Sequence, residues 1–225
     1  MTSLDIRARR IGREGLPIAL IDGFAKDPDA LRQHALGQTF TAARDHYPGV
    51  RAPLPPGYIH AQAPLLATVL DAVFGAKTAA RVLDAAFSMV TTPPDALGLH
   101  QRLPHIDATA PGRIALVHYL SPAPTAGTAF FRHRATGFEF VDAARSTGYF
   151  DTLNAEVQSG TAPSAGYIAS DTALFERTHR VDAAYNRAVI YRSNMLHSGA
   201  IEAETLLSCD PAVGRLTVTA FLTLD

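Results

Sequence analysis

Three residues of this chain are suited to binding a metal ion: His105 and Asp107, separated by one residue, and His197 far downstream. Side chains two apart on an extended strand point to the same face, so His105 and Asp107 can reach a common point. Two imidazoles and one carboxylate are the ligand set of non-haem Fe(II) sites, which leave coordination positions open. We therefore interpret His105, Asp107 and His197 as a candidate metal site.

The His-x-Asp pattern has a simpler interpretation, because the chain contains nine histidines. In an exposed turn, the aspartate would cap a backbone amide and the histidine would lie on the surface. Two features favour the metal site. Pro104 directly precedes the motif and favours an extended approach to it. His197 is expected at the end of the apolar strand 188–191, at the mouth of a barrel.

Composition limits the classes of function that remain. The 225 residues are 47% hydrophobic and 18% charged, which is typical of a globular domain. A net charge of -1 gives no general attraction to nucleic acid or to anionic membranes. The single cysteine, Cys209, excludes an intrachain disulfide and a cysteine-based zinc site. Residues 1–12 lack the apolar segment of a signal peptide, and we expect a soluble, cytoplasmic protein.

The first third of the chain predicts one strand and two helices that could support a site. The apolar run 16–21 ends at Asp22-Gly23, which indicates a buried strand followed by a turn. Asp27 and Pro28 predict the start of a helix that ends near residue 36. Apolar residues at three-to-four spacing over 65–74 predict a second helix that ends near Gly75. Four prolines within 47–58 predict an irregular loop.

The remainder of the chain predicts a series of strands. Short apolar runs separated by turn residues occur at 83–92, 114–120, 128–134, 187–192 and 215–224. Helix-like stretches interrupt them at 141–147 and 172–184. Helices followed by strands favour an α+β or mainly β domain built on a sheet sandwich or barrel.

The order of these motifs resembles that of the Fe(II)/2-oxoglutarate-dependent oxygenases, and it is closest to their prolyl-hydroxylase-like branch. Ala126-Gly127 stands where a Gly-Gly pair is common in that branch, and Ser121 stands where asparagine is usual. The chain therefore resembles an uncharacterised bacterial family within the branch. The resemblance rests on His105-x-Asp107, Val-His-Tyr-Leu-Ser at 117–121, Gly-Thr-Ala-Phe at 127–130, His197, Arg215-x-Thr217 and the opening Ile-Ala-Leu-Ile-Asp-Gly-Phe at 18–24.

The resemblance implies a fold and a domain organisation. It implies a double-stranded β-helix, or jelly roll, with N-terminal supporting helices. On this interpretation residues 1–225 form one oxygenase-like domain, with the N-terminal strand and helices at 16–80 and the jelly-roll core at 83–225. The long separation of Asp107 from His197 indicates an insertion near 140–166.

The resemblance also implies an activity. His105, Asp107 and His197 would be the catalytic ligands of Fe(II), and 2-oxoglutarate and O2 would be co-substrates. The implied reaction is hydroxylation of an amino acid, a peptide or a small metabolite, with release of succinate and CO2. We expect no nucleic-acid or membrane partner, and the oligomeric state is open.

Arg215 is the residue that favours 2-oxoglutarate over other co-substrates. Its planar guanidinium can bind a carboxylate through two parallel hydrogen bonds, and a buried arginine without an anion is costly. Thr217 can share the same face, and Tyr119 is a second candidate donor to 2-oxoglutarate. The alternatives are a solvent-facing arginine and an ordinary core tyrosine. His118 alternates with Tyr119, so only one of the two should face the site.

Two rival functions use the same fold. A cupin-type metalloenzyme that does not use 2-oxoglutarate would keep the three metal ligands but would have no use for an inward Arg215. A non-catalytic binding domain would keep the fold without the activity. Metal uptake and 2-oxoglutarate binding separate the three possibilities.

Overall fold

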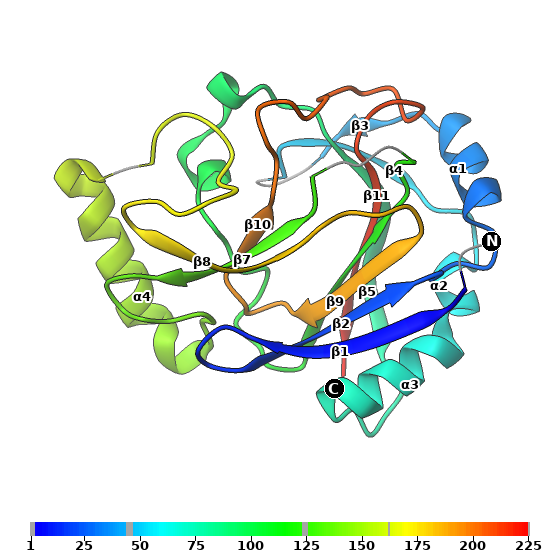
Figure 1. Ribbon diagram of the computed structural model, residues 1–225, viewed down its shortest axis with the longest axis horizontal. Coiled ribbons are helices and arrows are strands. Elements are labelled where there is room, and N and C mark those ends of the chain that lie inside the picture. The colour runs from blue at the N-terminus through cyan, green and yellow to red at the C-terminus, as the bar shows by residue number, and fades with distance from the viewer. Residues whose placement is uncertain (1–2, 44–46, 123–125, 162, 225) are drawn as a thin grey trace.

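Two antiparallel sheets dominate the computed structural model, which describes residues 3–43, 47–122, 126–161 and 163–224 (Figure 1). The larger sheet contains, in spatial order, β1 (Asp5–Ile11), β2 (Leu16–Asp22), β9 (Arg187–Arg192), β6 (Arg113–Tyr119), β11 (Leu216–Thr223), β5 (Arg81–Val90), β4 (Gly49–Pro53) and β3 (Thr41–Ala42). The smaller sheet contains β10 (His197–Gly199), β7 (Thr128–His133) and β8 (Phe175–Val181). The chain is therefore mainly β.

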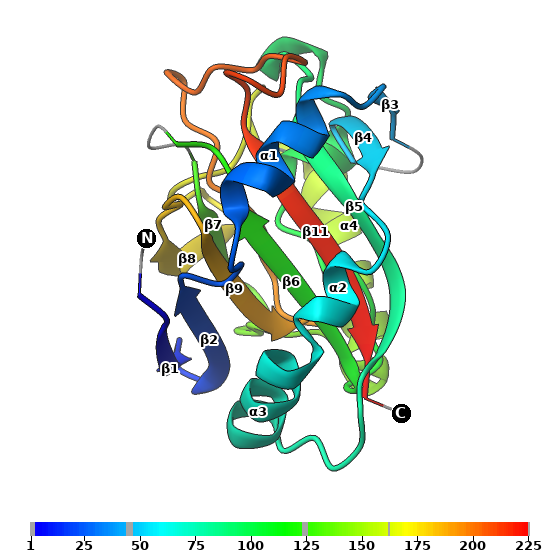
Figure 2. The same ribbon diagram turned by 90° about the vertical axis from the view of Figure 1, so that its right-hand side faces the viewer.

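Helices cover the outer faces of the sheets. Figure 2 shows α1 (Pro28–Leu36), α2 (Tyr58–Ala61) and α3 (Ala63–Phe74) in front of the larger sheet. Leu66, Val69 and Leu70 of α3 pack with apolar residues of β2, β6, β9 and β11. On the smaller sheet, α4 (Ala143–Glu156) buries Tyr149 and Leu153 against β7 and β8. Short helical turns complete the elements: η1 (Pro94–Ala96), η2 (Leu99–Arg102) and η3 (Val157–Thr161).

Side-chain alternation in the central strands separates a helix-packing face from an interior face. Leu216 and Val218 of β11 pack in the cluster that contains residues of α1, whereas Thr219 lies on the other face and lines the space between the sheets. In β6, His118 faces the helices and Tyr119 faces the interior. The predicted alternation of these two residues is confirmed. The interior face is therefore where a site can lie.

His118 belongs to a closed polar network on the helix side. The Tyr58 hydroxyl donates to its Nδ1 at 2.7 Å, and its Nε2 donates to Asn186 Oδ1 at 3.0 Å. Burial lowers the pKa of His118 to about 4, so the imidazole is neutral at pH 7. Both ring nitrogens are occupied, and this network links β6 to α2.

The local signals for the N-terminal helices are confirmed. The side chain of Asp27 accepts a hydrogen bond from the Ala30 amide at 2.8 Å, and α1 begins at Pro28. The second helix, α3, ends at Gly75, whose φ of +73° is costly for residues with a side chain. The strands predicted at 114–120, 128–134 and 187–192 match β6, β7 and β9 to within one residue at each end.

Two predictions about secondary structure were wrong. Residues 172–184 contain β8 rather than a helix, because pairing with β7 outweighs the weak helical pattern of a polar edge strand. The stretch 47–58 is not wholly irregular, because β4 follows Pro48, ends at Pro53 and pairs with β5. The polar N-terminal residues, for which no element was predicted, form β1, an edge strand. The helix expected at 141–147 begins at Ala143 and extends to Glu156.

No helix among the described residues combines the length and apolar character needed to cross a membrane.

Candidate metal centre

A backbone bridge holds the His-x-Asp motif beside His197. The His105 amide donates to the His197 carbonyl at 2.9 Å, and the His197 amide donates back to the His105 carbonyl at 3.0 Å. The Asp107 amide donates to the Ser193 carbonyl at 2.8 Å. The motif is thus an isolated bridge and not the strand that we predicted. His105, Ile106 and Asp107 all line one cavity, and Ile106 also packs against the apolar cluster that contains Tyr149 and Leu153 of α4.

His197 lies in a different element from the one expected. It does not end the strand 188–191, because β9 ends at Arg192 and His197 begins β10, paired with Phe130 of β7. Its ring packs edge-on against Tyr191, with ring centroids 4.7 Å apart. Its Nδ1 donates to the Met195 carbonyl at 2.8 Å. This bond fixes the tautomer and leaves the Nε2 lone pair free to bind a cation.

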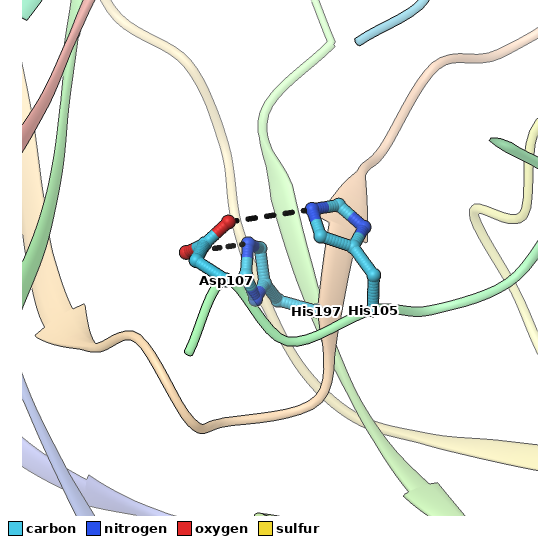
Figure 3. Close-up of side chains that lie close together, drawn as sticks. All are labelled: His105, Asp107 and His197. Atoms are coloured by element: carbon cyan, nitrogen blue, oxygen red, sulfur yellow. Dashed lines mark ion pairs between the residues drawn. The ribbon is translucent and has the colours of Figure 1, made fainter. Parts of the chain in front are cut away.

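The three side chains converge (Figure 3). Asp107 Oδ1 lies 3.7 Å from His105 Nε2, and Asp107 Oδ2 lies 3.6 Å from His197 Nε2. One ligand atom from each side chain lies within 4.8 Å of the other two. Donors that are each about 2.1 Å from one ion are about 3 to 4 Å apart, so the two measured separations suit a shared cation. The donor set fits a divalent transition metal.

The site holds its groups in protonation states that suit metal binding. Burial and the neighbouring His197 lower the pKa of His105 to about 4, and burial lowers that of His197 to about 4. Burial raises the pKa of Asp107 to about 6. His105 keeps 52% of its side-chain surface accessible, and it lines the cavity together with Asp107 and His197. Both imidazoles are therefore neutral ligands at pH 7.

These pKa shifts predict how metal affinity depends on pH. Below pH 6, a proton competes with the metal for Asp107, so affinity should fall about tenfold for each pH unit. Below pH 4, protonation of the two histidines should steepen this loss. Between pH 7 and 8 the affinity should be nearly constant. Calorimetric titration with Ni(II) from pH 5 to 8 measures the profile, and equal affinity at pH 5 and 7 would contradict it.

The metal candidates line a cavity of about 740 Å³ between the two sheets, and Arg215 lines the same cavity. Arg215 directly precedes β11 and is 5% exposed. Its Nε donates to the Ala126 carbonyl at 2.8 Å, and its Nη2 donates to the Gly127 carbonyl at 3.0 Å. Within the described ranges, no carboxylate lies within ion-pair distance of it. A buried positive charge therefore faces the cavity uncompensated.

The structure separates Thr217 and Tyr119 from this cavity. The Thr217 hydroxyl donates to the Ser88 carbonyl at 2.9 Å, and Thr217 is fully buried. The Tyr119 hydroxyl shares a 2.7 Å hydrogen bond with the hydroxyl of Thr128, and it is Thr128 that lines the cavity. The guanidinium of Arg215 lies 5.7 Å from the centre of the Tyr119 ring. Of the three predicted anion-binding residues, only Arg215 reaches the cavity.

Tyr47 is a cavity residue that sequence reasoning missed. Its hydroxyl is buried and has no hydrogen-bond partner in the part of the chain that the structure describes. Burial raises the pKa of Tyr47, and the nearby guanidinium groups of Arg215 and Arg51 and the side chain of Ser88 oppose this rise. A buried hydroxyl donor without a partner therefore lies close to Arg215. No periodicity marks this residue, which directly precedes Pro48.

Sequence comparison places the chain in a family. A family described as a family of unknown function, DUF6445, matches residues 2–222. The chain belongs to this family. No curated protein matches the sequence. Any functional conclusion for this DUF6445 protein therefore rests on its fold and its site.

Solved structures show which fold this DUF6445 protein shares. HygX from Streptomyces hygroscopicus, with nickel, 2-oxoglutarate and hygromycin B bound, is 12% identical, with a TM-score of 0.51 over 92% of this chain and 82% of HygX. The non-heme alpha ketoglutarate dependent epimerase SnoN from nogalamycin biosynthesis is 13% identical, with a TM-score of 0.47 over 92% and 78%. An oxidoreductase of the 2OG-Fe(II) oxygenase family from Burkholderia pseudomallei is 10% identical, with a TM-score of 0.35 over 99% and 74%.

The similarity to HygX is the comparison on which the assignment of the fold rests. At 12% identity it shows a common fold and nothing about activity. The expected resemblance to the Fe(II)/2-oxoglutarate-dependent oxygenases is thus confirmed at the level of the fold.

Proposed function

We propose that this protein is an Fe(II)- and 2-oxoglutarate-dependent oxygenase that hydroxylates an amino acid, a peptide or another small molecule and releases succinate and CO2. One observation carries the proposal. A cluster of two histidines and one aspartate shares a cavity with a buried arginine that has no carboxylate partner among the described residues. HygX, of the same fold, is a protein with nickel, 2-oxoglutarate and a small molecule bound.

The metal would be held by His105, Asp107 and His197, and each of these residues contributes differently. Asp107 supplies the negative charge that offsets a divalent cation, and its backbone is fixed to Ser193. His197 is oriented by Met195 and by the ring of Tyr191. His105 completes the set and is held by its bridge to His197. Bound Fe(II) would supply O2 activation, with 2-oxoglutarate providing two electrons as it is converted to succinate and CO2.

Arg215 would bind the far carboxylate of 2-oxoglutarate. The carbonyls of Ala126 and Gly127 hold two of its nitrogens and so fix the plane of the guanidinium. The remaining N–H groups are left for a carboxylate, which would also neutralise the buried charge. The Tyr47 hydroxyl would be a second donor to this carboxylate, in the role first assigned to Thr217 and Tyr119.

We also propose that the two sheets form a double-stranded β-helix and that residues 1–225 constitute one domain. The supporting arrangement is a larger and a smaller antiparallel sheet with the cavity between them. On this view residues 83–225 are the jelly-roll core, and α4 and η3 between β7 and β8 form an insertion near 140–166. The earlier strands and helices at 16–80 extend and cover the larger sheet.

Formation of succinate tests the proposed activity. Protein loaded with Fe(II) should convert 2-oxoglutarate to succinate slowly in air without added substrate, and metal-free protein should not. Mass spectrometry of succinate measures the rate, with Asp107→Ala as the inactive reference. Metal binding without 2-oxoglutarate binding would favour the cupin-type enzyme. Absence of metal binding would favour a non-catalytic domain.

Replacement of Tyr47 by phenylalanine tests the second donor. Because the hydroxyl has no partner among the described residues, its removal should not lower the free energy of unfolding. It should weaken 2-oxoglutarate binding by roughly fivefold, the effect of about one hydrogen bond. Urea unfolding and calorimetry measure the two quantities.

Tyr167→Phe is the matched control for Tyr47→Phe. The Tyr167 hydroxyl donates to the Thr92 carbonyl at 2.7 Å, so this change should cost about 1 kcal/mol of stability. It should leave 2-oxoglutarate binding nearly unchanged. If Tyr47→Phe destabilises the protein as much and leaves affinity intact, Tyr47 has only a structural role.

A further inference from the structure

The wall of the cavity carries an excess of positive charge. Two carboxylates line it, Asp84 and Asp107, whereas four guanidinium groups do so: Arg51, Arg102, Arg113 and Arg215. The chain as a whole has a net charge of -1, so this excess is a local property of the cavity. Neutral histidines add nothing to it at pH 7.

One cation of the wall is already neutralised. Arg51 forms an ion pair with Asp84, at 2.8 Å between Nη2 and Oδ2. It also donates to the hydroxyls of Ser88 and Thr219, each at 3.2 Å. Asp107 belongs to the metal cluster, and Arg215 serves the co-substrate in the proposed function. Two arginines, Arg102 and Arg113, have no anionic partner in the part of the chain that the structure describes.

Arg113 is the better placed of these two. The Nε of Arg102 donates to the Leu97 carbonyl at 2.9 Å. Arg113 begins β6 on the face that also presents Ala115 and Val117 to the cavity. Its guanidinium has neither a hydrogen-bond nor an ion-pair partner within the described residues. Among the described residues that line the cavity, Arg113 is therefore the arginine whose guanidinium has no partner.

The backbone places Arg113 beside the metal cluster. The Ser193 amide donates to the Arg113 carbonyl at 3.0 Å, and the Ser193 carbonyl accepts from the Asp107 amide. Arg113 pairs in register with Thr223, which is eight residues along the chain from Arg215. At about 3.4 Å per residue, those eight residues span roughly 27 Å. Arg113 and Arg215 therefore lie toward opposite ends of β11, and the far carboxylate that Arg215 would bind is not placed to neutralise Arg113.

We propose that the substrate carries a carboxylate or phosphate group and that Arg113 binds this anion at the metal side of the cavity; this inference rests on the proposed function. Arg113 is then a binding residue that orients the substrate. The apolar part of the substrate lies along Leu83, Val117 and Phe221, which line the same wall. Arg102 adds to the field that draws an anion into the cavity.

Binding of small aromatic probes tests the charge requirement. The protein is loaded with Ni(II) and saturated with 2-oxoglutarate, and benzoate, phenyl phosphate and benzamide are then titrated by calorimetry. Benzoate or phenyl phosphate should bind more tightly than neutral benzamide, and the tighter of the two anions indicates the native group. Equal affinity for benzamide and the two anions would overturn the proposal.

Arg113→Gln and Arg81→Gln provide the matched pair of variants. Both remove one positive charge from the same end of the larger sheet, since Arg81 and Arg113 pair with Thr223 from opposite sides. Arg81 is exposed and does not line the cavity. Arg113→Gln should weaken binding of the anions by roughly tenfold, whereas Arg81→Gln should not change it. Equal effects of the two variants would contradict the role of Arg113.

The test separates this inference from the proposed function. The dissociation constant of 2-oxoglutarate should be the same in Arg113→Gln as in the wild type. If the wild type binds neither Ni(II) nor 2-oxoglutarate, the proposed function fails. The probes can then be titrated against the metal-free protein, where loss of anion binding in Arg113→Gln still supports the anion site. Unchanged anion binding there overturns it.

Discussion

Replacing His105 with alanine is expected to weaken the binding of a divalent metal by roughly 100-fold or more. The change removes one of three ligands and leaves two, which hold an ion far less tightly. Fold stability should be preserved, because half of the His105 side chain is accessible and its backbone bridge to His197 does not depend on the imidazole. Calorimetric titration with Ni(II) at pH 7.5 measures the affinity.

His100→Ala is the control for this variant. His100 lines the same cavity and lies five residues earlier, but it is not part of the cluster of His105, Asp107 and His197. Its replacement should leave Ni(II) affinity within about twofold of the wild type. Thermal unfolding of the metal-free proteins checks that both variants fold. If His105→Ala binds Ni(II) as tightly as His100→Ala, the metal site lies elsewhere.

Replacing Arg215 with glutamine should strongly weaken 2-oxoglutarate binding while leaving metal binding intact. The loss should be roughly 100-fold or more in affinity, because the far carboxylate would be buried without a cation. Glutamine keeps an amide donor for the carbonyls of Ala126 and Gly127, which Arg215 now satisfies. Calorimetry of Ni(II)-loaded protein with 2-oxoglutarate measures the affinity, and Ni(II) titration measures the metal site separately.

Two further variants make the Arg215 result interpretable. Arg215→Lys keeps the charge but loses the planar fork, so it should recover part of the affinity. Arg81→Gln removes an exposed arginine outside the cavity and should have no effect. Wild-type affinity in Arg215→Gln would show that this arginine does not bind 2-oxoglutarate and would favour the cupin-type alternative.

The central strands were predictable from sequence, and the peripheral strands were not. β6 and β9 carry apolar residues on both faces, since one face packs on helices and the other on the interior. Such continuous apolar runs stand out in a sequence. β1 and β8 lie at sheet edges and are polar, and β4 is short and flanked by prolines. Their strand state comes from pairing with neighbours, which no local pattern records.

The metal candidates were predictable because their spacing has a direct geometric meaning. An extended backbone places His105 and Asp107 on one side whether or not it belongs to a full strand. The spacing of residues could not predict which groups surround the Tyr119 hydroxyl. Alternation predicts its inward direction, but only the packing of β7 shows that Thr128 stands between it and the cavity. Tyr47 was missed because its neighbour Arg215 is distant in sequence.

The most direct test of the central claim is an anaerobic titration of Fe(II)-loaded protein with 2-oxoglutarate, followed by absorption spectroscopy. Chelation of Fe(II) by the 2-oxo acid produces a charge-transfer band in the visible region. We expect this band to saturate at one 2-oxoglutarate per iron in the wild type, to be absent in His105→Ala and to require far higher concentrations in Arg215→Gln. A wild-type protein that binds Fe(II) but develops no band at saturating 2-oxoglutarate would contradict the assignment.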